Sequence, residues 1–578
     1  MTMRKSLTSI SVLLLPLFCA SVDAAILKNG SYGAESPCRC FPGDTCWPTI
    51  DVWDAFNTSL GGKLIPTIPI GAPCHRDTPT GYNSDQCRNL QDAWFLPETH
   101  LQSSSSTMAP FFTNNSCNPF SEPDTTCSLG NYVTYAVEAT DAADYQKVLE
   151  FSSSHNIRLV IRNTGHDYNG KSTGAGGLAL WTHNLKSKEL KQYNSTDYSG
   201  AALKFGAGVL GSEVFEFADF HGLVVVGGNQ PTLGFAGGYI QGGGHGPLAS
   251  KYGLAADQVL EWDVVLASGE TVTASADSAY ADLYWALCGG GGGIFGAVLS
   301  VTVKAYPAIS FSTASLTFAI PENASDAIVD TYFGAVGSFN QLVPSINDAG
   351  SVAVWLVTAQ AFVLSTLYAP GLDKKEVDTL LQPILDELDT SKIQYQYNSQ
   401  EYSSFLETFR AQVPVNVSNI NVGGRLIPRT LVEENNEALT AAIRNITYSG
   451  ALFSGVSFNV SRHAPDSVAA NPYLRDAIFD AVVATPFDYA NWETNLQSIN
   501  AITNVLLPQL SSLTPNGGAY LSESDFQQPE WESTFYGAHY DRLGQIKSKY
   551  DPDDLFYALG GVGSERWAQK SDGRLCKV

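Results

Sequence analysis

The sequence is poor in basic residues and in charge of either sign. Only 33 Lys and Arg stand against 57 Asp and Glu among 578 residues, which gives a formal net charge of −24. Nucleic acids and anionic membranes need a basic face on their partner, so neither is an expected partner. Charged residues make up 16% and aromatic residues 11% of the chain. Disordered chains are rich in charge and poor in aromatics, so the composition predicts a folded protein.

Long hydrophobic runs are missing after the N-terminus. Residues 9–18 are apolar but too few to span a bilayer. Arg4 and Lys5 before them form a basic n-region, and Val22-Asp23-Ala24 fits a small-x-small cleavage site. We therefore expect a signal peptide over residues 1–24, with a buried N-terminal helix as the alternative. No later segment has 18 unbroken apolar residues, so the mature chain is expected to be soluble, with no membrane partner.

The common nucleotide-binding motifs are also missing. The sequence has neither a G-x-x-x-x-G-K-[ST] phosphate loop nor a clean G-x-G-x-x-G that opens a helix, which argues against a nicotinamide site. Instead, glycines gather in three clusters, at residues 162–170, 227–246 and 289–296. Glycine lets backbone approach a ligand closely and turn N–H groups toward an anion. One cluster could be a tight turn, but three together indicate a large ligand lined by backbone.

The cysteines indicate an oxidising compartment. Nine of the ten remain after removal of a signal peptide, and seven of these lie between residues 38 and 127. This spacing predicts a disulfide framework rather than a metal site at Cys38, Cys40 and Cys46. Because nine is odd, we predict that Cys288 is unpaired and that Cys576 joins the N-terminal cysteines. The N-glycosylation sequons are at Asn29, Asn57, Asn114, Asn194, Asn323, Asn416, Asn445 and Asn459.

Hydrophobic periodicity divides the chain into two regions with different predicted secondary structure. After a loop-rich start with a polar linker at residues 103–106, residues 128–307 predict helices at 140–154, 212–221 and 282–287, strands at 157–161, 223–226 and 298–306, and a hairpin of 259–266 with 271–274. Residues 310–514 predict helices at 326–342, 374–388, 432–444 and 492–510 and strands at 352–362 and 452–460, and a further helix is predicted at 540–549. The middle region is expected to pack helices on one face of an antiparallel sheet.

Several motifs resemble one family when read together. They are Arg162-x-x-Gly165-His166-Asp167, Pro231-Thr232-x-Gly234, Gly242-Gly243-Gly244-His245-Gly246, Gly253-Leu254-Ala255-Ala256-Asp257, Pro529-x-Trp531 and Lys549-Tyr550-Asp551-Pro552. This set resembles the berberine-bridge-enzyme-like FAD-linked oxidoreductases of the vanillyl-alcohol-oxidase fold. The cysteine-rich start, Cys38 to Pro48, is similar to that of a secreted fungal branch described as isoamyl-alcohol-oxidase-like.

The resemblance implies an α+β, two-domain FAD-binding fold with an antiparallel-sheet substrate domain over the flavin ring. The implied segments are a signal peptide (1–24), a cysteine-rich lead-in (25–127), an FAD-binding domain (128–310), a substrate domain (311–514) and a C-terminal segment returning to the FAD domain (515–578). The cofactor is FAD, bound covalently through His166, with no metal. Further cofactor-binding residues are implied at Arg162, Asn163, Thr164, Gly165, Asp167, Thr232, Leu233, Gly234, Gly238, Gly243, Gly244, His245, Asp257 and Gly291.

The chain departs from the family pattern at three places. Gln230 stands where many members have a second, cysteinyl flavin link, so a single link is expected. Leu233 stands where bulky residues hinder access of O₂ to the flavin. In the tail, Ser522 and His539 replace the usual asparagines. The resemblance implies Tyr520 as the catalytic base, with His539 near the flavin as a possible source of the lowered pKa that a tyrosine base needs.

The expected function is that of a secreted, N-glycosylated FAD oxidoreductase. It would oxidise a small alcohol or a secondary metabolite by hydride transfer to flavin N5, with O₂ as a second substrate if the protein is an oxidase. Three alternatives stay open: a dehydrogenase with little reactivity toward O₂, a flavin-containing cyclase or isomerase, and a non-catalytic surface glycoprotein.

Overall fold

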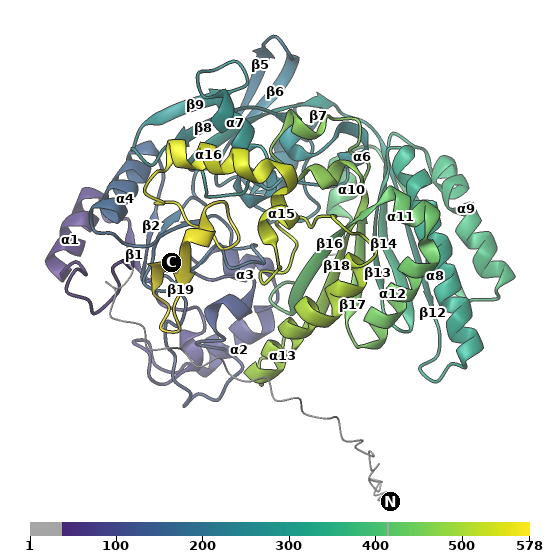
Figure 1. The fold of residues 1–578 in the computed structure, drawn as a ribbon, viewed down its shortest axis with the longest axis horizontal. Coiled ribbons are helices and arrows are strands. Elements are labelled where there is room, and N and C mark those ends of the chain that lie inside the picture. Colours follow the sequence, from purple (N-terminus) through teal and green to yellow (C-terminus); the bar gives the residue numbers. More distant parts are fainter. Residues whose placement is uncertain (1–36, 413–415) are drawn as a thin grey trace, which may run out of the picture. The chain divides into compact units, whose positions relative to one another are not determined.

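The structure is a computed structural model that describes residues 37–412 and 416–578 (Figure 1). The predicted signal peptide and the sequon at Asn29 lie outside the described residues. Within the described part of the chain, the strands form sheets of four, five and seven strands and two short two-stranded ribbons.

The four-stranded sheet carries the first glycine cluster. Its order is β1-β2-β4-β3, with β2, β4 and β3 parallel and β1 antiparallel to β2. The strands are β1 (Leu64–Pro66), β2 (Tyr135–Glu138), β3 (Leu159–Arg162) and β4 (Leu178–Trp181). Helix α4 (Ala142–Ser154) is the crossover that parallel strands need, and Asp141 caps it by accepting the Asp144 N–H at 3.0 Å. The loop after β3 therefore begins at the carboxyl end of a parallel strand, a common place for ligands.

The five-stranded sheet is antiparallel, in the order β5-β6-β10-β8-β9. Its strands are β5 (Lys188–Asn194), β6 (Ser199–Gly206), β8 (Val259–Val265), β9 (Thr271–Ser275) and β10 (Ala297–Lys304). The β8–β9 pair confirms the predicted hairpin. Helices α5 (Gly211–Phe220) and α7 (Ala281–Leu287) confirm the two predicted there, and β7 (Leu223–Val224), which follows α5, pairs with β11 (Tyr306–Pro307).

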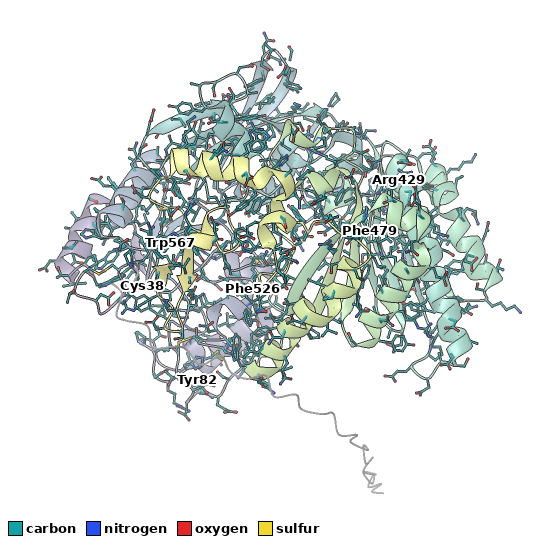
Figure 2. The ribbon with its side chains drawn as sticks, in the orientation of Figure 1. Cys38, Tyr82, Arg429, Phe479, Phe526 and Trp567 are labelled. Atoms are coloured by element: carbon teal, nitrogen blue, oxygen red, sulfur yellow. A yellow bond between two sulfur atoms is a disulfide. The ribbon has the colours of Figure 1, made fainter. Side chains whose placement is uncertain are left out.

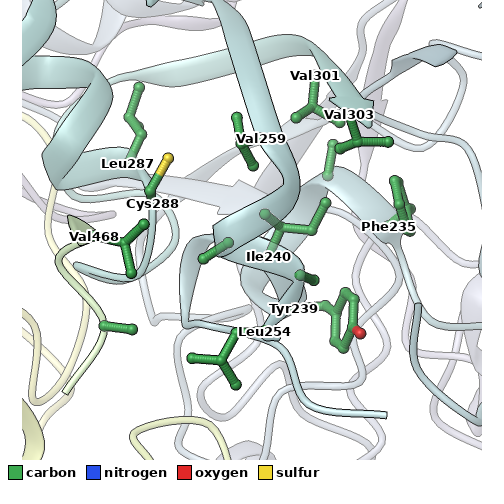
Figure 3. Packing of buried hydrophobic residues seen from close by; sticks show 14 of the residues in the cluster. Phe235, Tyr239, Ile240, Leu254, Val259, Leu287, Cys288, Val301, Val303 and Val468 are labelled. Carbon is green, nitrogen blue, oxygen red and sulfur yellow. The ribbon is translucent and has the colours of Figure 1, made fainter. Parts of the chain in front are cut away.

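The core beside this sheet contains the unpaired cysteine. Figure 3 shows Cys288 among apolar side chains that include Leu287, Val468 and Ile240. The indole N–H of Trp262 donates to the Cys288 sulfur at 3.4 Å, and burial raises the pKa of this thiol to about 12. Cys288 is the only free cysteine in the described chain, which confirms the prediction, and its thiol is uncharged at neutral pH.

The seven-stranded sheet is antiparallel, in the order β15-β12-β14-β13-β17-β18-β16. Its strands are β12 (Phe311–Ala319), β13 (Val352–Val357), β14 (Ala361–Pro370), β15 (Tyr395–Tyr402), β16 (Ile420–Pro428), β17 (Leu452–Ser457) and β18 (Ala477–Pro486). Helices α8 (Asp326–Asp348), α9 (Lys374–Thr390) and α12 (Asn436–Tyr448) pack on the sheet around Phe339, Trp355 and Phe362 (Figure 1). Helices on an antiparallel sheet are the predicted arrangement.

Three predicted elements of this region are divided in the structure. Residues 352–362 are not one strand but the start of a hairpin, because the Thr358 hydroxyl accepts the N–H groups of Gln360 and Ala361 and closes a turn without Gly or Pro. The helix predicted at 432–444 is broken at Asn435, between α11 (Arg429–Glu434) and α12. The helix predicted at 492–510 contains a wide turn at Ile502–Leu506 between α13 (Trp492–Ala501) and α14 (Leu507–Ser511). Pro508, which lacks an N–H, follows that turn.

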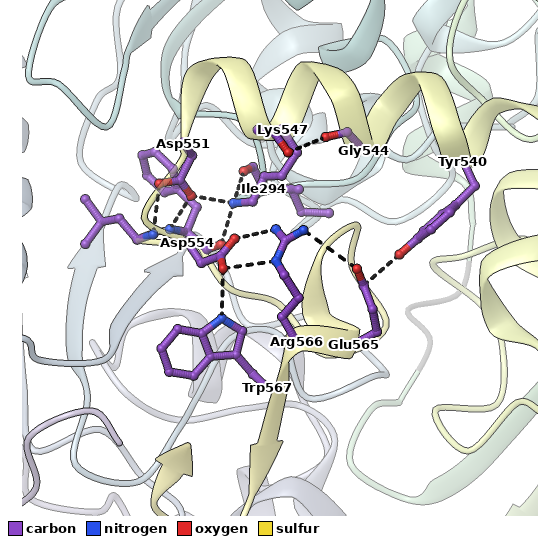
Figure 4. Close-up of polar contacts among 12 residues, drawn as sticks. Ile294, Tyr540, Gly544, Lys547, Asp551, Asp554, Glu565, Arg566 and Trp567 are labelled. Carbon is purple, nitrogen blue, oxygen red and sulfur yellow. Dashed lines mark hydrogen bonds and ion pairs between the residues drawn. The ribbon is translucent and has the colours of Figure 1, made fainter. Parts of the chain in front are cut away.

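The C-terminal segment packs against the third glycine cluster. It contains α15 (Trp531–Tyr536), α16 (Tyr540–Tyr550), β19 (Trp567–Gln569) and β20 (Leu575–Lys577), and α16 confirms the predicted helix and lies against α7. The buried Lys547 ammonium pairs with Asp551 and donates to the carbonyls of Ile294 at 2.9 Å and Phe556 at 2.7 Å (Figure 4). Because Ile294 directly follows Gly293, these bonds fix the end of the glycine cluster.

The lead-in is held by short helices and disulfides. The helices are α1 (Ile50–Ser59), α2 (Ser84–Ala93) and α3 (Pro97–Leu101), and the disulfides are Cys38–Cys576, Cys40–Cys46, Cys74–Cys87 and Cys117–Cys127. The predicted pairing of Cys576 with an N-terminal cysteine is confirmed. Beside that bond the Arg39 guanidinium stacks over Trp567 at 4.5 Å (Figure 2). Among residues 37–412 and 416–578, no helix has the length and apolar character needed to cross a bilayer.

Candidate active site

The glycine clusters enclose one large cavity. Its walls come from four stretches of chain, 161–172, 228–245, 292–298 and 520–523, together with Thr182, Ala207, Tyr557 and Ala558. The empty space is about 1420 Å³, part of it open to solvent. Four separate stretches of chain therefore meet around one cavity.

The loop after β3 forms one wall and depends on glycine. Gly165 has φ +85°, and a Cβ there would lie 2.6 Å from the Arg162 guanidinium and 2.8 Å from the Ser106 carbonyl oxygen. Any other residue would be strained and would clash, so the loop needs glycine at this position. Asp167 ties the loop to itself by accepting the N–H groups of Asn169 at 3.1 Å and Lys171 at 2.5 Å.

The opposite wall is backbone from the second and third clusters. A Cβ at Gly234 would lie 2.5 Å from Asn163 Oδ1, whereas Gly238 has open space beside it. Asn163 Oδ1 and Gln241 Oε1 are buried and accept no hydrogen bond within the described residues. Buried acceptors of this kind call for a donor from a ligand. A backbone-lined cavity with such acceptors fits a flavin dinucleotide, which offers ring N–H groups and compact phosphates.

His166 lies at this cavity with its imidazole held in place. Its Nε2 is 2.7 Å from the Thr232 hydroxyl, and no hydrogen-bond partner for Nδ1 occurs in the described part of the chain. Burial, and then the charge of His100, lower the pKa of His166 to about 4. The imidazole is therefore neutral at neutral pH, with one ring nitrogen available.

Arg162 lies behind the loop rather than in the cavity. Its guanidinium donates to the carbonyls of Ser103 at 2.8 Å and His100 at 3.4 Å, and burial lowers its pKa to about 9. Residues 103–106, predicted as a polar linker, are packed here, with the Ser106 hydroxyl 2.9 Å from His100 Nδ1. The cysteine-rich lead-in thus supports the His166 loop from outside.

Tyr520 and His245 meet at one end of the cavity. The Tyr520 hydroxyl accepts the Gly244 N–H at 3.1 Å, and its ring centroid lies 5.1 Å from that of His245. Burial, and then the negative charge of Glu523, raise the pKa of Tyr520. Hydrogen bonds from Ser522 and Gly244 lower this pKa by less than burial raises it, so the expectation of a lowered pKa is wrong and Tyr520 is a neutral phenol at rest.

Sequence reasoning missed two carboxylates at the same end. Glu523 Oε2 lies 3.3 Å from His245 Nε2, and Asp480 on β18 lies fully buried behind Glu523. Phe458 stacks on the far side of His245 with 5.7 Å between ring centroids. Glu523 follows the recognised tail tyrosine closely in sequence, so its position was a usable signal, whereas Asp480 lies in an apolar strand whose pattern marks only core.

The remaining predicted residues lie around the cavity rather than in its wall. His539 is buried elsewhere, with Nε2 3.0 Å from Asp466 Oδ1 and its ring against Trp285. Asp257 forms a buried bidentate ion pair with Arg475 at 2.8 and 2.9 Å.

The predicted residues that do line the cavity are Asn163, Thr164, Gly165, His166, Asp167, Leu233, Gly234, Gly238, His245 and Tyr520. Gly243, Gly244 and Gly291 belong to the adjoining backbone.

The seven-stranded sheet does not line the cavity. The sequence resemblance placed the substrate domain directly over the flavin ring, yet none of the described lining residues comes from 311–514. The loop at residues 520–524 lies between them: a Cβ at Gly424 on β16 would strike the Glu523 carbonyl, while Lys171 donates to the Leu521 carbonyl at 3.0 Å. The sheet therefore acts on the cavity through this loop and through Phe458 and Asp480.

Comparisons with known proteins agree with this geometry. A family described as "FAD binding domain" matches residues 133–275, and one described as "Berberine and berberine like" matches residues 519–563. The FAD-linked oxidoreductase sor8 of Hypocrea jecorina is 46% identical over 569 residues, 98% of this chain and 97% of the relative. The bifunctional decalin synthase calF of Penicillium decumbens is 37% identical over 557 residues, 94% of this chain and 96% of the relative.

A solved structure matches as well. The VAO-type flavoprotein MtVAO615 of Myceliophthora thermophila C1 is 38% identical, with a TM-score of 0.89 over 94% of this chain and 100% of that chain. The fold and the cavity thus define an α+β flavoprotein of the vanillyl-alcohol-oxidase type, which confirms the predicted fold class. Given such relatives over nearly its whole length, the chain belongs to the berberine-bridge-enzyme-like FAD-linked oxidoreductases.

Proposed function

We propose that this protein oxidises a small alcohol or a hydroxyl-bearing secondary metabolite with an FAD bound covalently through His166. The single observation that carries the proposal is the neutral, hydrogen-bonded His166 imidazole at the wall of a backbone-lined cavity beside Tyr520 and His245. The bound flavin supplies the hydride acceptor.

A single covalent link is the form the cavity supports. Gln230 occupies the position of the second tether and lines the cavity, and none of the described lining residues is a cysteine. Cys288 is buried against Trp262, and the other eight described cysteines are in disulfides. Asn163, Thr164 and Asp167 would hold the flavin beside His166, and Thr232 fixes which imidazole nitrogen is free.

Tyr520 is assigned a binding role toward the substrate. A neutral phenol can donate its proton in a hydrogen bond to the substrate oxygen while Gly244 holds the phenol oxygen. Tyr520→Phe is expected to slow anaerobic flavin reduction about 5-fold, because one hydrogen bond contributes roughly 1 kcal/mol. Stopped-flow reduction measures this loss. A rate equal to that of the wild type would remove Tyr520 from the site.

Leu233 is proposed to restrict access of O₂. Its side chain lines the cavity and packs toward Gly228, where a Cβ would lie 3.0 Å from Leu233 Cδ2. Leu233→Val is expected to speed reoxidation of the reduced protein severalfold and to leave anaerobic reduction unchanged. If the wild type already reoxidises as fast as Leu233→Val, the restriction lies elsewhere.

Anaerobic reduction followed by exposure to air tests the function. Bleaching of the bound flavin by alcohols or hydroxylated metabolites under nitrogen supports oxidation, and fast recovery in air makes the protein an oxidase rather than a dehydrogenase. A second candidate, a cyclase or isomerase, is favoured by the 37% identity to a decalin synthase. It predicts product formation without net bleaching. A protein that neither bleaches nor converts any substrate would be a non-catalytic glycoprotein.

Secretion is proposed on two observations of the described chain. The eight described cysteines other than Cys288 are all in disulfides, and Asn114, Asn194, Asn323, Asn416 and Asn445 are exposed at their sequons. Disulfides persist in oxidising compartments, where N-glycosylation also occurs. A shift in mass after treatment with a glycosidase that removes N-glycans, together with recovery from culture medium, tests this proposal.

A further inference from the structure

Three distant parts of the chain bring titratable groups together behind Tyr520. His245 lies at the end of the second glycine cluster, Glu523 lies in the C-terminal segment, and Asp480 lies on β18. One ring nitrogen of His245 and one carboxylate oxygen each of Glu523 and Asp480 lie within 4.8 Å of one another. His245 and Glu523 face the cavity, and Asp480 lies behind them with no exposed surface.

The cluster contains more carboxyl groups than positive charges to balance them. Both Asp480 oxygens are buried and have no hydrogen-bond partner among the described residues. Arg425 on the neighbouring strand is engaged with Thr514, and Lys171 with the Leu521 carbonyl. The Glu523 side chain is 28% exposed whereas Asp480 is fully buried, so without a cation between the two carboxyl groups a proton is expected on Asp480.

The groups that face the pair come from each surrounding element. Tyr239 and His245 approach from the second glycine cluster, Tyr168 from the His166 loop, and Tyr520 from the tail. The three tyrosines are neutral phenols, so the imidazole is the group here that offers a ring nitrogen to accept a proton. Phe458 covers one face of that imidazole, and the imidazole Nε2 lies 3.3 Å from Glu523 Oε2.

We infer that His245 is the catalytic proton acceptor of the oxidation, that the Glu523 carboxylate orients it and stabilises its charged form, and that Asp480 holds one proton against Glu523. The assignment rests on the proposed function. The substrate O–H bond breaks and its proton moves to the free nitrogen of His245. The electron pair left on oxygen would form the C=O bond, and a bound flavin would supply the acceptor for the hydride released from carbon. A carboxylate bound to the other imidazole nitrogen is the arrangement that makes histidine an effective base.

Chemical rescue tests the role of His245. His245→Ala is expected to slow anaerobic flavin reduction by about 10²-fold or more, and added imidazole to restore at least about 10-fold of the loss. The matched control is His539→Ala, a buried histidine outside the cavity, which is expected to reduce at the wild-type rate and gain nothing from imidazole. Unchanged reduction in His245→Ala, or a loss that imidazole cannot restore, would overturn the assignment.

The proton on Asp480 is tested without turnover. The infrared spectrum of the wild type is expected to contain the C=O stretch of a protonated carboxyl group that disappears in Asp480→Asn. The buried Asp144, which pairs with Lys63, provides the control Asp144→Asn, which should keep the band. Persistence of the full band in Asp480→Asn would overturn the shared proton. So would its absence from the wild type together with loss of a bound metal on chelation, because a cation would then separate the carboxylates.

The pH dependence of stability gives a second readout. Burial, and then the charge of Glu523, hold the pKa of Asp480 well above its usual 3.8. A raised native pKa contributes stability only below the unfolded value, and that contribution is lost as pH rises toward the native value. Asp480→Asn removes this loss, so its Tm should exceed that of the wild type by about 2 °C at about pH 8 and match it at about pH 4. The opposite order would show that Asp480 is ionised in the folded state.

A failure of the proposed oxidation can be distinguished from a failure of the assignment of His245 as proton acceptor. If no substrate bleaches the wild-type flavin, the proposed oxidation fails, while the infrared and Tm measurements still decide the shared proton. If the wild type bleaches and His245→Ala bleaches equally fast, the oxidation stands and only the proton acceptor is wrong.

Discussion

His166→Ala is expected to release all flavin on acid precipitation, whereas the wild type should keep its flavin on the precipitated protein. The physical reason is that His166 has the neutral imidazole and the free ring nitrogen that a covalent bond to the flavin requires. Absorbance of the supernatant and of the redissolved pellet measures the outcome. His539→Ala is the control, since His539 is buried outside the cavity, and it should retain the flavin.

The chemistry of the link gives two further checks. Thr232→Val removes the hydrogen bond to Nε2 and should slow attachment of FAD to flavin-free protein without abolishing it. Because the pKa of His166 is about 4, the rate of attachment should be flat above about pH 5 and fall below about pH 4, where the imidazole becomes protonated. Flavin found on a cysteine in a peptide map, or free flavin from the wild type, would contradict the single histidyl link.

Opening the Cys38–Cys576 disulfide is expected to cause the largest loss of stability. This bond joins residues 538 apart, and its loss increases the entropy of the unfolded chain, which should lower the free energy of unfolding by roughly 6 kcal/mol in the chain-entropy model. The double variant Cys38→Ser/Cys576→Ser would be compared with wild type in urea unfolding and in Tm.

The matched control for this prediction is Cys117→Ser/Cys127→Ser, whose bond joins residues only 10 apart. Because the entropy of closing a loop grows with the logarithm of its length, the control should lose about 3.5 kcal/mol less than the terminal variant. Equal losses would mean that local packing, such as the stacking of Arg39 on Trp567, determines the effect instead of loop closure.

Much of the fold could be predicted from the sequence because the signals are local. The spacing of apolar residues predicts α4, α5, α8 and the β8–β9 hairpin, and the odd cysteine count together with the glycine run predicts an unpaired Cys288. The elements predicted wrongly lack a local signal. The turn between β13 and β14 has no Gly or Pro and is closed by the Thr358 hydroxyl, so its apolar neighbours read as one strand.

The sequence by itself determined the ligand class and the loop that carries His166. Clustered glycines are a local signal of backbone that can lie close to a ligand. Only the tertiary structure decided which titratable groups meet. In the fold His539 lies against Asp466, and Asp257 pairs with Arg475. His245, Glu523 and Asp480 lie close together although their segments are more than 40 residues apart in the chain. The physical reason is that the charge and pKa of a group depend on its burial and on the groups near it in space. The spacing of residues along the chain predicts neither the burial nor the neighbours.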